Sequence, residues 1–264
     1  MHRRGRWGST PPAATVSGVD PIEAHRRISF STMFNFRDVG GYPTGDGRAV
    51  AWGRLYRSDS PHRIDGADRD AFVALGIRTV IDLRRPFEVA RDGRVPELDG
   101  LTYRHIHPEH TAWSESQYEP GSSLARYLAD RYADLAGTGA AGLAEAVGLI
   151  ADGAAAPVVV HCVAGKDRTG IVCALTLSAL GVSDADIAAD YALSTEAAAR
   201  FSAWVAATTP ETEELPAPFL ASPAEAMSLF LTELRAGHGS AEEYLRHAGV
   251  TDAQLAALRD HLLE

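Results

Sequence analysis

The architecture of this 264-residue chain is set by residues 158–170, which read Val158-Val159-Val160-His161-Cys162-Val163-Ala164-Gly165-Lys166-Asp167-Arg168-Thr169-Gly170. The β-branched run at the start of this stretch is typical of a buried strand. A short polar loop follows, and a helix-like run then extends from Arg168 to Leu180. A strand, a tight loop and a helix N-terminus in this order direct backbone N–H groups and the positive end of the helix dipole at one point, which is a typical site for an anion.

Two side chains of the loop indicate which reaction this anion site could catalyse. Cys162 begins the loop and Arg168 ends it, with five residues between them. The planar guanidinium of Arg168 can bind two phosphate oxygens at once, and a cysteine thiolate, which positive surroundings favour, can attack phosphorus. The alternative for Cys162 is a small buried hydrophobic residue. The residues expected to bind phosphate are those along the loop: Val163, Ala164, Gly165, Lys166 and Thr169.

Residues 161–170, HCVAGKDRTG, resemble the C-x5-R-[ST] loop of cysteine-dependent phosphatases. The Lys-Asp pair narrows the resemblance to the bacterial tyrosine phosphatase family with the loop HCxAGKDRTG, which includes dual- and triple-specificity enzymes that act on phosphoproteins and phosphoinositides. The resemblance covers roughly residues 25–263 and implies a protein-tyrosine-phosphatase-like fold. Three further segments agree with it: Asn35-Phe36-Arg37-Asp38-Val39-Gly40-Gly41, Tyr56-Arg57-Ser58-Asp59 and Ile81-Asp82-Leu83-Arg84.

Phosphate ester hydrolysis also needs a proton donor for the leaving oxygen. Asp167 lies inside the loop, and the resemblance implies that it is this acid; its alternative role is to brace the loop. Asp82, at the end of a predicted strand, is the second candidate, and its alternative is a salt bridge to a neighbouring arginine. No Trp-Pro-Asp sequence occurs, so a separate acid-bearing loop of that kind is not indicated.

Other loop residues are expected to support the reaction. His161 would hold the loop from behind, and the Thr169 hydroxyl could donate a hydrogen bond to the cysteine sulfur. Gly165 and Gly170 would let the backbone close around phosphate. Lys166 is the only lysine in the chain; its ammonium at the mouth of the site could meet a second phosphate or an acidic peptide, or stabilise the thiolate.

Two segments outside the loop are predicted to support it. Asn35 would brace the loop from a turn, while Arg37 and Asp38 would pair with each other or with Arg57 and Asp59.

A histidine-rich segment and the second cysteine are assigned no catalytic role. The histidines at positions 105, 107 and 110, beside Glu109, suggest a metal site only weakly, since they fall in a predicted loop and cysteine-based phosphate chemistry needs no metal. We therefore expect no metal and no cofactor. Cys173 follows Cys162 by eleven residues on the next helix, where it is expected to lie in the core.

Strand-like runs alternate with helix-like runs along the chain, which predicts an α/β fold with a mainly parallel central sheet flanked by helices. Ligands bind at the carboxyl ends of the strands in such sheets, and the cysteine loop follows one. The predicted strands are 54–56, 79–83, 101–106 and 157–161; the predicted helices are 65–75, 121–135, 142–152, 168–180, 183–193, 222–235, 240–248 and 251–262. The family resemblance implies that residues from about 197 to 235 form a helical lid over the site; the alternative is a core helix followed by a surface loop.

Composition limits the remaining possibilities. A hydrophobic content of 45% suits one domain over residues 21–264, preceded by a disordered tail over residues 1–20. The net charge of −10 argues against a nucleic-acid binder, and two cysteines suit a reducing compartment. We expect a cytoplasmic protein without a transmembrane segment, although relatives exported without a recognisable signal make export the alternative. The sequence leaves the oligomeric state open.

The complete loop predicts a metal-free phosphomonoester hydrolase that acts on a phosphorylated protein or a phosphoinositide. The alternative is a module on the same fold that binds phosphotyrosine or phosphoinositide without turnover. Such a module would usually lack the cysteine or the arginine, and this chain has both. Loop depth separates phosphotyrosine from phosphoserine, and the sequence does not give that depth.

Overall fold

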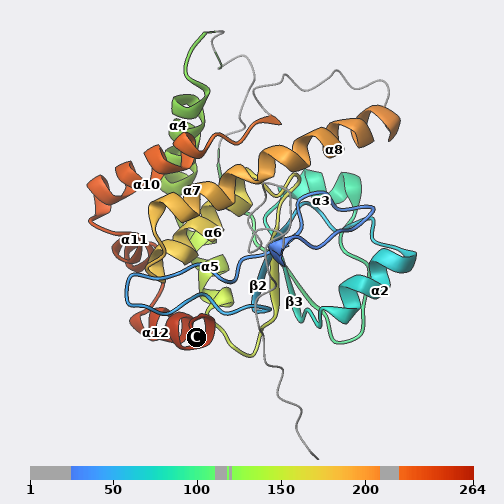
Figure 1. The fold of residues 1–264 in the computed structure, drawn as a ribbon, viewed down its shortest axis with the longest axis horizontal. Helices are drawn as coiled ribbons and strands as arrows, with labels where there is room; N and C mark the ends of the chain where they lie inside the picture. The colour runs from blue at the N-terminus through green and yellow to red at the C-terminus, as the bar shows by residue number, and fades with distance from the viewer. Residues whose placement is uncertain (1–24, 111–117, 119–120, 209–219) are drawn as a thin grey trace, which may run out of the picture.

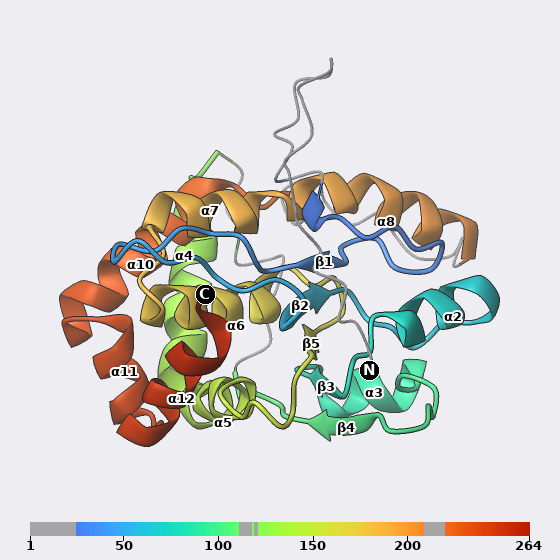
Figure 2. The ribbon, with the colours of Figure 1, turned by 60° about the horizontal axis from the view of Figure 1, so that its bottom comes forward.

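The computed structural model describes residues 25–110, 118, 121–208 and 220–264 (Figure 1). The predicted N-terminal tail and the centre of the predicted lid, residues 209–219, lie outside the described residues. A single sheet with helices on both faces forms the body of the molecule (Figures 1 and 2).

Within the described residues, the sheet has five strands in the order β1-β2-β5-β3-β4, and of its strand pairs only β1–β2 is antiparallel. The prediction of a mainly parallel α/β sheet is therefore confirmed. The four predicted strands are present with small shifts of their ends, and β1 lies in a segment that we predicted as a turn. The strands are β1 Arg37–Asp38, β2 Leu55–Ser58, β3 Thr79–Asp82, β4 Thr102–His105 and β5 Val158–His161.

The central strand β5 carries the apolar run of the sequence into the core. Its side chains alternate between two hydrophobic clusters: Val158 and Val160 face one, and Val159 faces the other. Residues Ser58 and Asp82 of the flanking strands are both in register with His161. The carboxyl ends of the three strands therefore meet at one edge of the sheet, where the cysteine loop begins.

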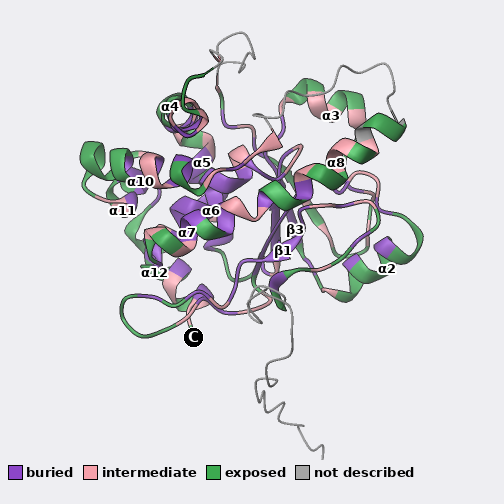
Figure 3. Cartoon of the chain, turned by 45° about the horizontal axis from the view of Figure 1, so that its top comes forward, coloured by how far each residue is buried: buried purple, intermediate pink, exposed green. Residues whose placement is uncertain are grey.

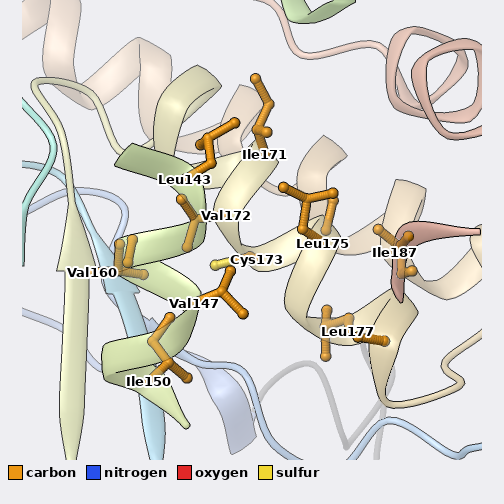
Figure 4. Close-up of a cluster of buried hydrophobic side chains, with 14 of the residues drawn as sticks. Leu143, Val147, Ile150, Val160, Ile171, Val172, Cys173, Leu175, Leu177 and Ile187 are labelled. Atoms are coloured by element: carbon orange, nitrogen blue, oxygen red, sulfur yellow. The ribbon is translucent and has the colours of Figure 1, made fainter. Parts of the chain in front are cut away.

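The larger cluster is built by helices that follow and precede the loop. Helix α6 leaves the loop directly and is buried along almost its whole length (Figure 3). Figure 4 shows its Cys173 enclosed by aliphatic side chains from neighbouring elements, as expected for a core cysteine. The helices are α2 Gly66–Ala74, α3 Pro86–Asp92, α4 Leu124–Thr138, α5 Ala140–Ile150, α6 Asp167–Ala179, α7 Asp184–Ala192, α8 Ser194–Thr208, α10 Ala224–His238, α11 Ala241–His247 and α12 Asp252–Leu262.

Four of the predicted helices begin at a Ser or Thr that could cap them, and three of these four start as predicted. Ser183, Ser240 and Thr251 each accept a hydrogen bond from a backbone N–H of the first turn, as the predicted helix starts require. Ser222 does not cap α10, which begins after Pro223. The Ser222 hydroxyl instead bonds Thr195 and the Ala192 carbonyl, so it ties α10 to the α7–α8 junction.

The predicted lid region contains two different helices. Helix α8 is continuous where the sequence suggested irregular structure, and it lies beside the cysteine loop. Helix α10 packs in the core, with Met227, Phe230 and Leu231 almost fully buried. A lid over residues 197–235 stays a prediction for α8, whereas the burial of α10 fits the alternative of a core helix.

No single helix among the described residues has both the length and the apolar content to cross a membrane. The pair α4 and α5 satisfies both conditions together, but the two helices meet at 83°.

Replacing Met227 by Ala tests whether α10 is a core element. Met227 is 0% exposed, so its removal should cost about 2–5 kcal/mol of unfolding free energy through lost burial and a residual cavity. Urea denaturation measures this loss. Thr232→Ala, at an exposed position of the same helix, is the control and should stay within about 0.5 kcal/mol of wild type. Equal, small effects would show that α10 is not part of the core.

Candidate active site

The cysteine loop connects β5 to α6 and rests on the end of β2. Cys162 directly follows β5 and is 3% exposed. Gly165 has a φ of +66°, and a Cβ there would lie 2.3 Å from the carbonyl oxygen of Ser58. Only glycine allows this approach, so the loop can turn tightly against the neighbouring strand.

Three groups from the N-terminal third of the chain hold carbonyl oxygens of the loop. The amide Nδ2 of Asn35 donates to Ala164 O at 2.9 Å, Arg57 Nη2 donates to Gly165 O at 2.8 Å, and Ser60 N donates to Val163 O at 3.1 Å. The predicted role of Asn35 as a brace agrees with this contact. In the described part of the chain, the amides of residues 163–165 donate no hydrogen bond. They are therefore available to an anion.

The predicted pairing of Arg37 and Arg57 with Asp38 and Asp59 is wrong. Both arginines instead form ion pairs with a carboxylate that the sequence did not single out. Asp190 of α7 accepts from Arg37 Nε at 2.9 Å and from Arg57 Nη1. All three side chains are buried. Burial alone would raise the pKa of Asp190, but the two guanidinium groups outweigh it and hold that pKa well below its usual range.

Asp38 and Asp59 bind backbone amides instead of the arginines. Asp59 accepts from Phe34 N and Asn35 N at 3.0 Å, which fixes the segment that carries the Asn35 side chain. Asp38 accepts from Gly40 N and Gly53 N at 2.8 Å. Burial raises the pKa of both carboxyls. These residues thus shape the turn beside the loop and do not form ion pairs with Arg37 or Arg57.

Arg168 is held by a glutamate on α3, a helix that the sequence reading also missed. Glu88 Oε2 and Oε1 accept from Arg168 Nη1 and Nη2 at 2.6 and 3.1 Å, and Leu83 O accepts from Nη1 at 3.3 Å. Burial opposes the charge of Arg168, but Cys162 and Glu88 outweigh burial and raise its pKa. A guanidinium clamped from one side can present its other edge to phosphate.

Asp167 is the first residue of α6, and its side chain is 21% exposed. Its Oδ1 accepts a hydrogen bond from the Tyr132 hydroxyl at 2.5 Å and lies 3.6 Å from Lys166 Nζ. The carboxyl is therefore partly open and adjacent to the loop cations, a location consistent with either predicted role.

Asp82 forms the salt bridge that was its alternative assignment. Its side chain is 0% exposed, and Oδ2 accepts from Arg84 Nη2 at 2.6 Å and from the Tyr103 hydroxyl at 2.9 Å. Burial alone would raise the pKa of Asp82, but His161 and Arg84 outweigh burial and hold it well below its usual range. A carboxyl so enclosed and ionised is poorly suited to donate a proton to substrate.

His161 lies behind the loop, as expected. Its Nδ1 is 3.1 Å from Cys162 O, and its Nε2 is 3.6 Å from Asp82 Oδ2. Burial lowers the pKa of His161 and the neighbouring Asp82 opposes this, and the ring supports the loop backbone by packing and hydrogen bonding.

Lys166 and Thr169 differ from expectation. The Lys166 ammonium is buried and donates to Ala221 O at 3.0 Å, which ties the loop to the segment before α10. It is not an open cation at the mouth. The Thr169 hydroxyl is buried and has no hydrogen-bond partner among the described residues, so the predicted bond to the Cys162 sulfur is not formed.

A pocket opens beside the loop, between the segment around Phe34 and helix α8. Its polar lining consists of Asn35, Asp59, Lys166 and Ser194. The apolar lining consists of Phe34, Ala164, Ala197, Ala198, Phe201 and Leu220. Helix α8 therefore contributes a wall next to the phosphate loop.

The histidine-rich segment does not assemble a metal site. The Nδ1 of His110 lies 3.0 Å from Arg85 Nη2, and the His107 ring is 6.0 Å from the His110 ring. Within the described ranges, no group of three His, Cys, Asp or Glu side chains could hold a metal ion.

The site therefore combines a cysteine and an arginine on one strand–loop–helix turn, with three loop amides available to an anion. This arrangement on a mainly parallel α/β sheet defines the class of cysteine-dependent phosphatases.

The chain belongs to the tyrosine phosphatase family, whose family model matches residues 28–264. It is 31% identical to a candidate tyrosine-protein phosphatase of Cupriavidus necator over 96% of this chain and 92% of that one. It is 32% identical to the triple specificity protein phosphatase PtpB of Mycobacterium tuberculosis over 87% of this chain and 96% of that one.

Among solved structures, the catalytic core of the PP-IP phosphatase Siw14 from S. cerevisiae overlays with a TM-score of 0.33 and 15% identity. The overlay covers 69% of this chain and 83% of that one, and at this score we draw nothing from it.

Asp190→Asn should destabilise the protein by about 3–5 kcal/mol, because two buried arginines lose their counter-charge. The control is Asp184→Asn on the same helix, whose exposed pair with Arg235 should contribute at most about 1 kcal/mol. Urea denaturation measures both.

The pH dependence gives a second check on the same variant. Because the folded pKa of Asp190 is depressed, its stabilisation is present above the unfolded pKa of about 4 and is lost as the pH falls. The difference between wild type and Asp190→Asn should therefore shrink below about pH 4. If Asp190→Asn and Asp184→Asn lowered the free energy of unfolding equally at neutral pH, Asp190 would not be the counter-charge that Arg37 and Arg57 share.

Proposed function

We propose that this chain is a metal-free phosphomonoester hydrolase that works through a phosphocysteine intermediate. The observation that carries the proposal is the joint position of Cys162 and Arg168 on a loop whose amides at residues 163–165 have no intramolecular acceptor among the described residues. A dianionic phosphate bound there would meet oriented donors and lie above the sulfur.

In the first step, the Cys162 thiolate attacks phosphorus and the bond from phosphorus to the leaving oxygen breaks. Asp167 gives its proton to that oxygen, so the leaving group departs as a neutral hydroxyl. The loop amides and Arg168 stabilise charge on the three equatorial oxygens in the transition state. Glu88 keeps the guanidinium in the plane that this contact needs.

In the second step, water attacks the phosphocysteine, the phosphorus–sulfur bond breaks and Asp167 takes a proton from the water. The buried Thr169 hydroxyl, which has no partner among the described residues, is available to donate to the departing sulfur once the loop holds phosphate. This bond would ease release of the thiolate.

For the substrate we propose phosphotyrosine in proteins. An aryl group extending from the loop would meet the apolar wall formed by Phe34, Phe201 and Leu220. The similarity to a relative named as a triple specificity protein phosphatase supports a protein substrate, and it leaves open a wider range of substrates. The buried Lys166, bonded to Ala221 O, gives weaker support to a phosphoinositide with a second phosphate.

The assay is phosphate release, with EDTA present, from a phosphotyrosine peptide, a phosphoserine peptide and phosphoinositides. Cys162→Ser should reduce release to below about 1% of wild type, because a serine hydroxyl is a far weaker nucleophile than a cysteine thiolate. Binding of inorganic vanadate or phosphate should persist. Residual activity well above that level would contradict the nucleophile assignment. Tight phosphate binding by a wild type that releases nothing would favour a non-catalytic binding module.

Asp167→Asn separates the proposed acid from a structural carboxylate. It should slow hydrolysis of a phosphotyrosine peptide by about 100-fold, and of p-nitrophenyl phosphate much less, because p-nitrophenolate leaves without protonation. The measurement is kcat on both substrates at several pH values. Equal losses on the two substrates would remove Asp167 from the role of acid.

A further inference from the structure

The carboxyl of Asp167 is held by a hydroxyl from a helix far away in the sequence. Tyr132 of α4 donates to Asp167 Oδ1 at 2.5 Å. Tyr132 is 0% exposed, whereas the Asp167 side chain is 21% exposed. A rigid, buried donor thus fixes one oxygen of a carboxyl whose remainder is open.

A second tyrosine sets the direction of this hydrogen bond. The hydroxyl of Tyr191, on α7, pairs with the hydroxyl of Tyr132. Burial, followed by the negative charge of Asp167, raises the pKa of both phenols well above 10. Both therefore stay protonated throughout the working range. When Tyr132 donates its one hydrogen to Asp167, its oxygen can accept the hydrogen of Tyr191.

The core fixes the place of both rings. The Tyr132 ring packs edge-to-face with Tyr191, at 5.9 Å between centroids, and with Phe230 of α10, at 6.1 Å. The absence of a side chain at Gly170 leaves space for the Tyr191 ring, since a Cβ at Gly170 would lie 3.1 Å from Tyr191 Cδ2. The last glycine of the loop motif therefore has a specific packing function beside this pair.

We propose that Tyr132 is a positioning residue that holds Asp167 for proton transfer, and that Tyr191 fixes the direction of its hydrogen bond. The inference rests on the proposed function, because it takes Asp167 as the acid. Since Oδ1 accepts from Tyr132, the transferable proton resides on Oδ2. It passes from Oδ2 to the leaving oxygen as the sulfur–phosphorus bond forms, and Oδ2 recovers a proton from water in the second step.

The charged and titratable groups around Asp167 come from several elements. Lys166 Nζ of the loop is 3.6 Å from Oδ1, and the charge of Arg168 interacts with Asp167 from α6. Tyr132 from α4 and Tyr191 from α7 complete the set given by the described residues. Of Tyr132 and Lys166, the two groups beside Oδ1, Tyr132 can be changed to an isosteric residue that removes a donor and no charge.

Tyr132→Phe is the test. It should lower kcat on a phosphotyrosine peptide about tenfold and on p-nitrophenyl phosphate less than about twofold, because only the peptide needs the acid. The basic limb of the pH–rate profile on the peptide should move to higher pH, since the ionised carboxyl loses a donor that stabilises it. Tyr191→Phe should give a smaller loss, about threefold, again confined to the peptide, and it serves as the measurement if Tyr132→Phe does not fold.

Two controls separate positioning from a general effect of the core. Tyr244→Phe removes another buried tyrosine hydroxyl, which donates to Ala136 O of α4 at 2.7 Å, and it should keep wild-type kinetics on both substrates. The double variant Tyr132→Phe/Asp167→Asn should be no slower than Asp167→Asn, because the tyrosine acts only through the carboxyl.

Equal losses on the two substrates with an unmoved pH profile would overturn the positioning role. A double variant tenfold slower than Asp167→Asn would do the same. Both outcomes leave the Cys162-dependent release of the wild type intact, so they are distinct from failure of the proposed function, in which the wild type shows no such release.

Discussion

Asp190 is a buried carboxylate shared between Arg37 and Arg57, and the position of the phosphate loop follows from this pairing. Arg57 bonds Gly165 O, while Arg37 bonds the Oδ1 of Asn35, whose amide in turn bonds Ala164 O. The loop is thus held at two carbonyls through one counter-charge on α7. A buried ion pair of this kind adds little net stability but is costly to break, so it fixes geometry more than it strengthens the fold.

The same arrangement explains why the anion site faces outward. Carbonyl oxygens of the loop point to donors behind it, so the peptide planes turn their N–H groups toward the space above Cys162. The guanidinium of Arg168 is fixed separately by Glu88, from the helix that follows β3. Two independent supports therefore set the two halves of the phosphate site. Register at the carboxyl ends of β2, β5 and β3 brings these supports together.

The sequence was informative where structure is local. A β-branched run, a glycine-containing loop and Ser or Thr caps predict β5, the loop and the starts of α7, α11 and α12, because these depend on neighbours in the chain. The partners of buried charges were not predictable in this way. Asp190 lies 133 positions after Arg57, and Glu88 lies 80 positions before Arg168. Nothing in their local sequence marks either carboxylate, so pairing Arg37 and Arg57 with nearby Asp38 and Asp59 was wrong.

The aromatic residues that reach the loop were missed for a related reason. In the sequence, Tyr132 and Tyr191 look like core positions of amphipathic helices, and in the structure they are core residues. Unlike an apolar core side chain, a buried phenol needs a hydrogen-bond partner for its hydroxyl. Tyr132 finds one in the carboxyl at the start of α6, and Tyr191 finds one in the Tyr132 hydroxyl. Packing of α4, α7 and α10 therefore determines where that carboxyl stands. Loss of the Tyr132 hydroxyl should alter proton transfer at the loop before it alters phosphate binding, because Asn35 and Arg57 hold the loop carbonyls and Glu88 holds Arg168.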